Sequence, residues 1–390
     1  MRDPDSRRPL VSLTRRAALL ALGAAGLART AMAADPVIVG VSGPLTGPAA
    51  QYGAQWKKGF DLALDDINGP GGGIKGRPLA YQFEDSQNDP RQSVAIAQKF
   101  VGDQKIVVEI GDFSSPASMA ASPIYQRGKL VQFGFTNSHP DFTKGGDYMW
   151  SNSISQSEQS PQLATFAVQQ LGLKKVAILH LNTDWGRTSK DLAVATVKAL
   201  GAEVVATEGY MPEERDFRST LVRVRDAHPD GVILISYYAD GALIARQTRV
   251  AGITQPLVAI GSVYSPKFIE LGGDAVDGVY TQSNFFPEEP RPEVKDFVAR
   301  FTARYHEEPD AFNAYGYDTM VLLAAVMRQF GTTRADIRTG LEKIRDVPSV
   351  IFGRVAFDPV TRRVAGANTA NLQVKGGKFV SWDGKPAPRS

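Results

Sequence analysis

The strongest constraint on the fold of this chain is a regular alternation of short β-branched segments with longer amphipathic ones. Residues 36–41, Pro-Val-Ile-Val-Gly-Val, have the composition of a buried strand. The segment that follows has a helical period in which Trp56, Phe60 and Ile67 share one face, and it ends at Asn68-Gly69-Pro70. A strand followed by an amphipathic helix is the repeating unit of a parallel sheet.

The alternation continues through two consecutive units. Residues 79–83 and 106–110 are strand-like, and Asp89-Pro90 between them is typical of a helix start, with a capping acid followed by proline. Further strand-like segments, separated by helical ones, occur at 130–134, 176–179, 203–206, 231–235 and 256–260. The chain is therefore predicted to be an α/β protein with two doubly wound lobes, each built on a mostly parallel sheet covered on both faces.

The last third of the chain is mainly helical. Helical patterns occupy residues 291–305, 311–330 and 333–344, and short strand-like segments follow near Val355 and at 371–374. These segments alone would make an unusual third domain. We therefore expect the chain to return to both lobes, so that several crossing segments lie side by side as a hinge. A cleft between hinged lobes is a common place for a small-molecule site.

The first 33 residues have the features of an export signal peptide. Thr14-Arg15-Arg16 precedes an apolar run that ends at Leu27, and Ala31-Met32-Ala33 supplies small residues for cleavage near Ala33. The paired arginines favour the twin-arginine route over the Sec route, although the usual phenylalanine is missing from the residues after them. The run is about half of the roughly 20 residues that span a bilayer, so we expect no membrane insertion.

The excess of positive over negative charge in the chain comes from this leader. Residues 1–33 contain six of the 44 basic and two of the 41 acidic residues, which leaves a remainder of 38 basic and 39 acidic residues. A balanced chain without a Lys/Arg-rich stripe gives no reason to expect nucleic acid or an anionic membrane surface as a partner. The chain has no cysteine, which excludes disulfides, thiolate catalysis and a lipid-anchoring cysteine.

The sequence contains no motif for a cofactor, a metal or catalysis in the structural context that the motif requires. Gly71, Gly73 and Gly76 have the spacing of a dinucleotide loop, but they follow a helix and precede a strand, so we interpret them as a turn. His306-Glu307-Glu308 lacks the second histidine of a zinc hydrolase helix. There is no nucleophile elbow with Ser/His/Asp partners and no phosphate-binding loop. We therefore expect no metal, no cofactor and no enzymatic activity, with a hydrolase using Asp184 or His139 as the rejected alternative.

Seven short motifs occur in a characteristic order and spacing. They are Gly43-Pro44-Leu45-Thr46-Gly47, Gln51-Tyr52-Gly53, Asp66-Ile67-Asn68 running into residues 71–76, Asp85-Ser86-Gln87-Asn88-Asp89-Pro90, Ser114-Ser115, Asp184-Trp185-Gly186 and Tyr315-Gly316-Tyr317-Asp318. With them the chain resembles the type I periplasmic binding proteins related to the leucine/isoleucine/valine-binding protein, and the resemblance covers nearly the whole chain after the leader. It implies a periplasmic, monomeric solute-binding protein that delivers a small molecule to an inner-membrane ABC permease.

The resemblance also implies how the lobes divide the chain. They are expected to exchange it three times, near residues 155, 285 and 365. The N-terminal lobe then comprises residues 35–155 and 285–365, and the C-terminal lobe comprises residues 156–284 and 366–390. Ligand binding is expected to close the two lobes around the hinge.

The carboxylate-binding residues are expected on the N-terminal lobe. Ser115 and Ser138 resemble, by position, the family residues that hold a ligand carboxylate with hydroxyl and backbone N–H groups, and Thr136 and Asn137 lie on the loop of Ser138. From the residues alone, Ser114-Ser115-Pro116 is where a strand turns into a helix, and helix-start amides favour an anion. A plain helix cap is the alternative role of the serine pair, and it is compatible with ligand binding.

The ligand class is inferred from a departure from the family. In its amino-acid binders, a glutamate after the strand equivalent to residues 256–260 neutralises the ligand ammonium group. The present segment, Ile260-Gly261-Ser262-Val263-Tyr264, has no acid, and an unpaired buried ammonium group costs several kcal/mol. Asp184 or Asp240 is the alternative partner for an ammonium group.

Aromatic residues are frequent in the same loops: Phe113, Trp185, Tyr237, Tyr238, Tyr264 and Phe285. Tyr52, Trp185 and Tyr237 lie where the family has the walls of its site. We therefore predict a small organic carboxylate with an aromatic body, such as a benzoate or phenylpropanoid. A branched-chain or other hydrophobic amino acid, or a role in ligand sensing, are the alternatives. The predicted ligand-binding residues are Tyr52, Phe113, Ser114, Ser115, Thr136, Asn137, Ser138, Trp185, Tyr237, Ser262 and Tyr264.

Overall fold

The structure is a computed structural model that describes residues 34–69, 72–364 and 366–384. The predicted signal peptide with its cleavage position at Ala33, and Gly71 of the glycine-rich turn, lie outside these residues. Residues 36 onward cluster as a single unit, and the description concerns that unit. Among the described helices, none combines the length and the apolar character needed to cross a bilayer.

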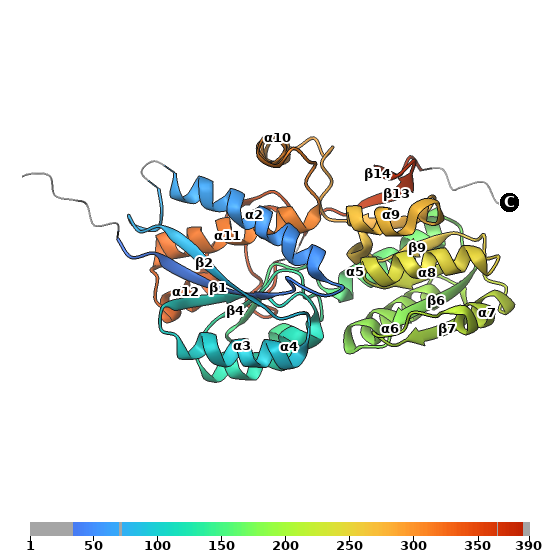
Figure 1. Cartoon of the computed structure of the whole chain (residues 1–390), viewed down its shortest axis with the longest axis horizontal. Coiled ribbons are helices and arrows are strands. Elements are labelled where there is room, and N and C mark those ends of the chain that lie inside the picture. The colour runs from blue at the N-terminus through green and yellow to red at the C-terminus, as the bar shows by residue number, and fades with distance from the viewer. Residues whose placement is uncertain (1–33, 70–71, 365, 385–390) are drawn as a thin grey trace, which may run out of the picture. The chain divides into compact units, whose positions relative to one another are not determined.

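The first half of this unit is built on a five-stranded parallel sheet with the order β2-β1-β3-β4-β5. Helices α3 and α4 lie on one side of the sheet and α2 on the other (Figure 1). The hydrophobic residues form two separate clusters, and the smaller one, with Phe100 and Tyr125, lies under α3 and α4. The elements are β1 (Val37–Gly43), α2 (Ala50–Asn68), β2 (Leu79–Asp85), α3 (Pro90–Gly102), β3 (Ile106–Ile110), α4 (Ser115–Arg127), β4 (Gln132–Gly134) and β5 (Met149–Ser151).

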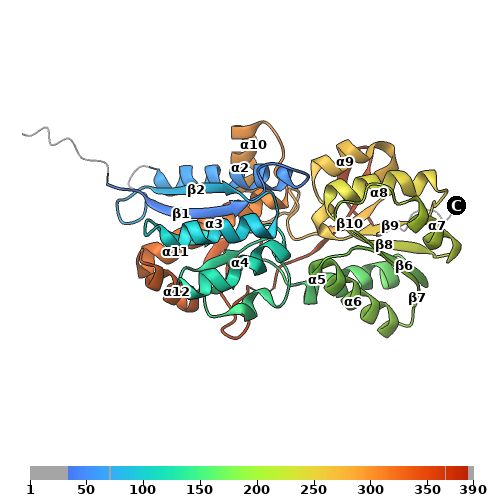
Figure 2. The same ribbon diagram turned by 60° about the horizontal axis from the view of Figure 1, so that its bottom comes forward.

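The second half contains a seven-stranded sheet with the order β14-β13-β10-β9-β8-β6-β7. Its strands β6 to β10 are parallel, whereas β13 and β14 join antiparallel at one edge. Helices α8 and α9 cover one side and α5 and α6 the other (Figure 2). The elements are α5 (Gln156–Thr165), β6 (Lys175–Leu181), α6 (Asp184–Ala199), β7 (Glu203–Tyr210), α7 (Arg218–Asp226), β8 (Gly231–Ile235), α8 (Tyr238–Val250), β9 (Leu257–Ala259), α9 (Pro266–Gly272), β10 (Tyr280–Ser283), β13 (Ala370–Lys375) and β14 (Lys378–Ser381).

Helices α10 (Pro292–Tyr305), α11 (Ala311–Phe330) and α12 (Arg334–Lys343) bring the chain back to the first sheet. Helix α11 packs closely on α2, where a Cβ added to Gly59 would lie 2.2 Å from the carbonyl oxygen of Asn313. The guanidinium of Arg334, at the start of α12, donates to four backbone carbonyls between α3 and β3. The strand-like segment near Val355 is β12 (Gly353–Val355), which pairs with β11 (Val347–Ser349) in a separate hairpin.

The predicted fold class, two doubly wound lobes with mostly parallel sheets joined by a hinge of several segments, is confirmed. The chain leaves the five-stranded sheet after Ser151, leaves the seven-stranded sheet after Ser283, and rejoins the latter at Ala370. The lobe boundaries near residues 155, 285 and 365 stay predictions. The short strands β5, β10, β11 and β14 were missed because three or four residues carry no periodic signal.

Candidate ligand-binding site

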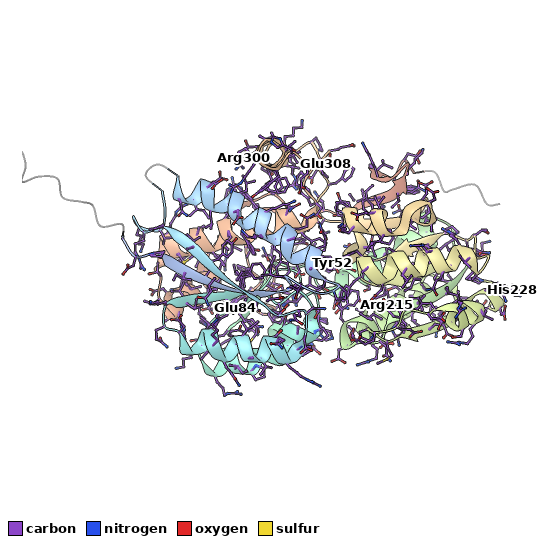
Figure 3. The ribbon with its side chains drawn as sticks, viewed as in Figure 1. Tyr52, Glu84, Arg215, His228, Arg300 and Glu308 are labelled. Atoms are coloured by element: carbon purple, nitrogen blue, oxygen red, sulfur yellow. The ribbon has the colours of Figure 1, made fainter. Side chains whose placement is uncertain are left out.

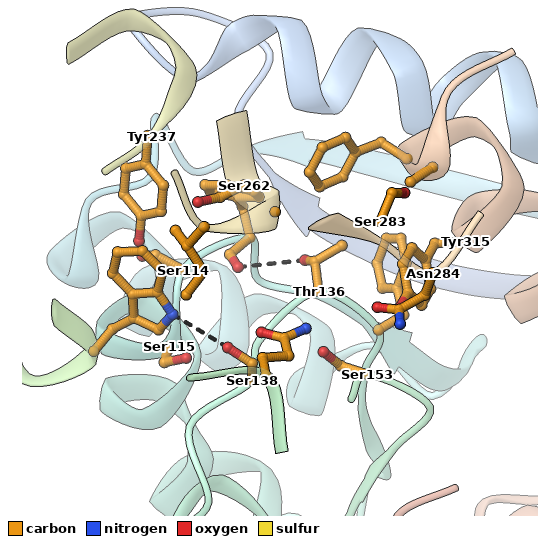
Figure 4. Close-up of a pocket in the computed structure, with 18 of the residues that line it drawn as sticks. Ser114, Ser115, Thr136, Ser138, Ser153, Tyr237, Ser262, Ser283, Asn284 and Tyr315 are labelled. Carbon is orange, nitrogen blue, oxygen red and sulfur yellow. Dashed lines mark hydrogen bonds between the residues drawn. The ribbon is translucent and has the colours of Figure 1, made fainter. Parts of the chain in front are cut away.

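A cavity with about 80 Å³ of water-accessible space, enough for several water molecules, lies beside segments that follow the strands of both sheets. Most of its lining comes from the loops directly after β3, β4, β5, β6, β8, β9 and β10, which is where parallel α/β sheets bind ligands. The first turns of α11 complete it. The lining residues are Phe113, Ser114, Ser115, Phe135, Thr136, Ser138, Ser153, Gln159, Trp185, Tyr237, Ile260, Gly261, Ser262, Gln282, Ser283, Asn284, Ala311, Phe312 and Tyr315 (Figure 4).

Ser115 lies in the first turn of α4, directly after β3. Its hydroxyl oxygen accepts the backbone N–H of His139 at 3.2 Å. Within the described residues its own proton has no acceptor, so this proton is available to a ligand. Ser114 precedes it as the helix cap, yet the Ser114 side chain makes no capping hydrogen bond. A donor hydroxyl at a helix start favours an anion at this end of the pocket.

The hydroxyl of Ser138, like that of Ser115, accepts an N–H and keeps its own proton available. Its hydroxyl oxygen accepts the indole N–H of Trp185 at 3.1 Å, and no acceptor for its own proton occurs among the residues that the structure describes (Figure 4). Trp185 is held in place by its backbone: the amide of Gln156 donates to its carbonyl at 2.6 Å, and Thr183 caps the helix by accepting from Gly186. The bond therefore joins the loop after β4 to the helix after β6.

Aromatic rings form the walls of the cavity. The rings of Trp185 and Tyr237 are stacked, with centroids 5.0 Å apart and planes at 22°. The ring centroid of Phe113 lies 5.1 Å from that of Tyr237 and 6.3 Å from that of Phe312. Burial raises the pKa of the Tyr237 and Tyr315 hydroxyls, so both stay neutral near pH 7. Aromatic rings from several segments thus contribute to the cavity lining, and rings of this kind offer edge and face contacts to an aromatic group.

Among the described residues, none that lines the cavity is Asp, Glu, Lys, Arg or His. Asp184 is exposed and pairs with Arg187. Asp240 pairs with Arg215 at 3.2 Å, and burial raises its pKa to about 6. Neither acid reaches the cavity lining, so neither takes the place of the missing ammonium partner in this arrangement. In the same part of the chain, no group of three His, Cys, Asp or Glu side chains is placed to hold a metal.

The family model described as "periplasmic binding protein" matches residues 36–378. The chain belongs to the periplasmic binding proteins. This is a family of solute-binding transport components rather than of enzymes.

One curated relative and two solved structures are similar to this chain. The Leu/Ile/Val-binding protein homolog 1 of Brucella suis is 26% identical over 355 residues, which cover 90% of this chain and 92% of the relative. A leucine-binding protein from Thermotoga maritima has a TM-score of 0.82 at 24% identity, covering 89% of this chain and 97% of the other. A solute-binding protein from R. palustris in complex with benzoate has a TM-score of 0.81 at 21% identity, covering 89% and 95%. The two structural likenesses show the fold alone.

In this periplasmic binding protein, eight of the eleven predicted ligand-binding residues line the cavity, and three do not. Tyr52 lies near the start of α2 (Figure 3). Its hydroxyl donates to the carbonyl of Ser262 at 2.7 Å and accepts the N–H of Tyr238. Asn137 is buried behind the loop, where its amide donates to Ser118. Tyr264 packs on Phe379, with ring centroids 4.8 Å apart. The ligand-binding role of all eleven residues stays a prediction.

Some lining residues were not predicted from the sequence: Phe135, Ser153, Gln159, Ile260, Gly261, Gln282, Ser283, Asn284, Ala311, Phe312 and Tyr315. For Tyr315 a signal existed, because it begins one of the motifs that carry the family resemblance. Ser283 and Asn284 adjoin the expected crossing near residue 285, so a search of the hinge segments would have found them. The others depend on tertiary packing.

Proposed function

We propose that this protein is the extracytoplasmic solute-binding component of an ABC importer and that its ligand is a small organic carboxylate with an aromatic body, such as a benzoate or phenylpropanoid. One observation carries the ligand class: the cavity has donor hydroxyls and aromatic walls, but no acidic side chain among its described lining residues. A buried α-ammonium group would lack a charged partner there, whereas a carboxylate would find the protons of Ser115 and Ser138.

Ring stacking supports the second half of the proposal. The rings of Trp185, Tyr237, Phe113 and Phe312 line the same cavity as the two serines, so an aromatic acid with its carboxylate at the serines would have these rings as neighbours. Offset or edge contacts between rings contribute about 0.5–1.5 kcal/mol beyond the area that they bury.

Closure of the two lobes is the proposed mechanism. The bond from Trp185 to Ser138 and the bonds of Tyr52 to Ser262 and Tyr238 link segments that follow different sheets. A ligand that touches both sets of segments binds the closed form better than the open form and so increases its population. The closed form then presents a surface of both lobes to the permease.

Calorimetric titration of ligand-free, refolded protein tests the ligand class. Benzoate, 4-hydroxybenzoate and a phenylpropanoid are compared with leucine, valine and benzamide. We expect an aromatic carboxylate to bind with a Kd of about 1 μM or below, equivalent to about 8 kcal/mol, and leucine to bind much more weakly. Tighter binding of leucine than of every aromatic acid would overturn the proposal in favour of an amino-acid binder.

Two serine variants on the same helix test the site. Ser115→Ala removes the proposed carboxylate donor and should weaken benzoate binding about tenfold. Ser122→Ala is the matched control, because the Ser122 hydroxyl donates to Gln132 inside the five-stranded lobe. Equal losses in both variants would contradict a direct role for Ser115.

Uptake of the ligand in a deletion strain, compared with ligand-dependent gene induction, separates transport from sensing.

A further inference from the structure

Arg363 is a buried cation whose hydrogen bonds all go to neutral groups. Its side chain is only 6% exposed. The guanidinium donates to the carbonyl oxygens of His139 at 2.6 Å and Ser153 at 3.1 Å, and to the hydroxyl of Ser151 at 3.2 Å. Among the residues that the structure describes, its Nε has no hydrogen-bond partner. No carboxylate lies within ion-pair distance of Arg363 in the described residues, which is unusual because buried charges are generally paired.

The charge of Arg363 lies directly behind the cavity. Ser153 lines the cavity, and its carbonyl accepts from the guanidinium. His139 follows Ser138, and the N–H of His139 donates to the hydroxyl of Ser115. The guanidinium thus contacts the backbone of one lining residue and of the residue that orients another. The backbone of Arg363 pairs in an isolated parallel bridge with Ser151, the last residue of β5.

The guanidinium keeps its charge at neutral pH. Burial lowers the pKa of Arg363 only to about 10. The neighbouring imidazole of His139 is neutral near pH 7, because burial lowers its pKa and its Nδ1 accepts the N–H of Asp141. Glu158, in the first turn of α5, is the acid that acts on Arg363. It is exposed and makes no ion pair with Arg363 among the described residues, so it offsets the buried charge only in part.

Two buried carboxylates lie next to lining residues in sequence. Asp310, beside Ala311, accepts from Gln55, Phe312 and Asn313 and is turned into α11, and the other is Asp112, beside Phe113. Its oxygens accept from the hydroxyls of Ser86 and Ser93 and from the N–H of Phe113. The two serines do not line the cavity, so the carboxylate is turned into the five-stranded lobe and already has three donors. Burial raises its pKa. Asp112 is therefore locally compensated, whereas Arg363 is not.

We infer that Arg363 is a specificity-determining residue: its uncompensated charge, acting through the backbone of Ser153 and His139, makes a cavity without charged lining residues select anionic over neutral ligands. This inference rests on the proposed function, since it concerns the carboxylate of the proposed ligand. A single charge at this range in a poorly hydrated site changes the affinity for an anion by about tenfold or more. Arg363 would act without touching the ligand.

The test is the ratio of affinities for benzoate and its neutral isostere benzamide, measured by calorimetry on the full-length exported protein. Arg363→Gln removes the charge and retains donors, whereas Arg363→Lys retains the charge and loses the planar fork. We expect the ratio to fall about tenfold in R363Q and to persist in R363K. A purely structural role would weaken both ligands equally and leave the ratio unchanged in R363Q, which would overturn the inference, as would an equal fall in R363K.

A second variant keeps the inference testable if R363Q does not fold. Glu158→Gln changes an exposed residue and removes the acid that opposes Arg363, so the ratio should rise about twofold. An unchanged or lower ratio in E158Q would overturn the inference. A different result would contradict the proposed function: a wild-type protein that binds no aromatic carboxylate at all.

Discussion

The indole N–H of Trp185 donates a hydrogen bond of 3.1 Å to the hydroxyl of Ser138, and the two residues follow strands of different sheets. This bond fixes two walls of the cavity at once. It also leaves the proton of the Ser138 hydroxyl available to the proposed ligand, because the oxygen already accepts.

Trp185→Phe retains an aromatic ring but removes the N–H donor of this bond. We therefore expect benzoate affinity to fall about fivefold, in line with the loss of one hydrogen bond. The Ser138→Ala, Trp185→Phe double variant should show coupling, with a combined loss smaller than the sum. Trp150→Phe is the control, since the Trp150 indole donates to Asp147 within the five-stranded lobe. Strictly additive losses would show that the bond does not contribute.

Tyr52→Phe should speed ligand release. The Tyr52 hydroxyl is fully buried and bonds both Ser262 and Tyr238, so its loss leaves two backbone groups unpaired at about 1–3 kcal/mol in the closed form. In an open form water reaches these groups, so the free protein should keep its Tm. Stopped-flow dissociation of benzoate measures the effect. Tyr305→Phe, which removes a bond to Lys58, is the control.

Gly186→Ala should damage both stability and binding. A Cβ at Gly186 would lie 1.8 Å from the carbonyl oxygen of Leu181, so the start of α6 must move and Trp185 with it. We expect a loss of several kcal/mol in unfolding free energy and a large drop in affinity. Gly102→Ala, with no atom within 4 Å of the added Cβ, should change neither. Denaturant unfolding and calorimetry measure the two effects.

Stability should decrease between pH 5 and pH 8, in part through Asp310. This buried acid caps α11 by accepting from Phe312 and Asn313, and burial raises its pKa to about 7. Because the folded pKa exceeds the unfolded value, its contribution is complete below about pH 4 and is lost as the pH rises through 7. Asp310→Asn should therefore reduce the difference in Tm between the two pH values. Asp89→Asn, at an exposed cap, controls for the change in capping group. An undiminished difference in D310N would contradict the assignment.

Much of the fold could be predicted because local signals agree with the tertiary structure. The helix expected at residues 311–330 has those bounds in the structure, since Asp310 caps it and its apolar residues are buried. The helix start at Asp89-Pro90 was equally clear, and the cap accepts from Arg91 and Gln92. Strands such as β5 and β14 escaped prediction because their pairing partners, rather than their own residues, make them strands.

The site was less predictable, for reasons of tertiary packing. The family resemblance pointed to Ser115, Ser138 and Trp185, which do lie around one cavity. Arg363 carries no local signal: an arginine beside an exposed turn is ordinarily solvated, and this one is buried against His139, Ser151 and Ser153, which are distant in sequence. Phe312 likewise reaches the cavity because α11 returns to pack on α2.

Most of the lining residues lie on short segments that begin where a strand ends. The polar ones among them, such as Ser114, Thr136 and Asn284, lie outside the hydrophobic core clusters, so substitutions there change the cavity wall at little cost in folding free energy. A gene duplicate of this protein therefore needs only a few loop exchanges to acquire a new nutrient. Directed evolution of the same loops is a practical route to altered uptake specificity.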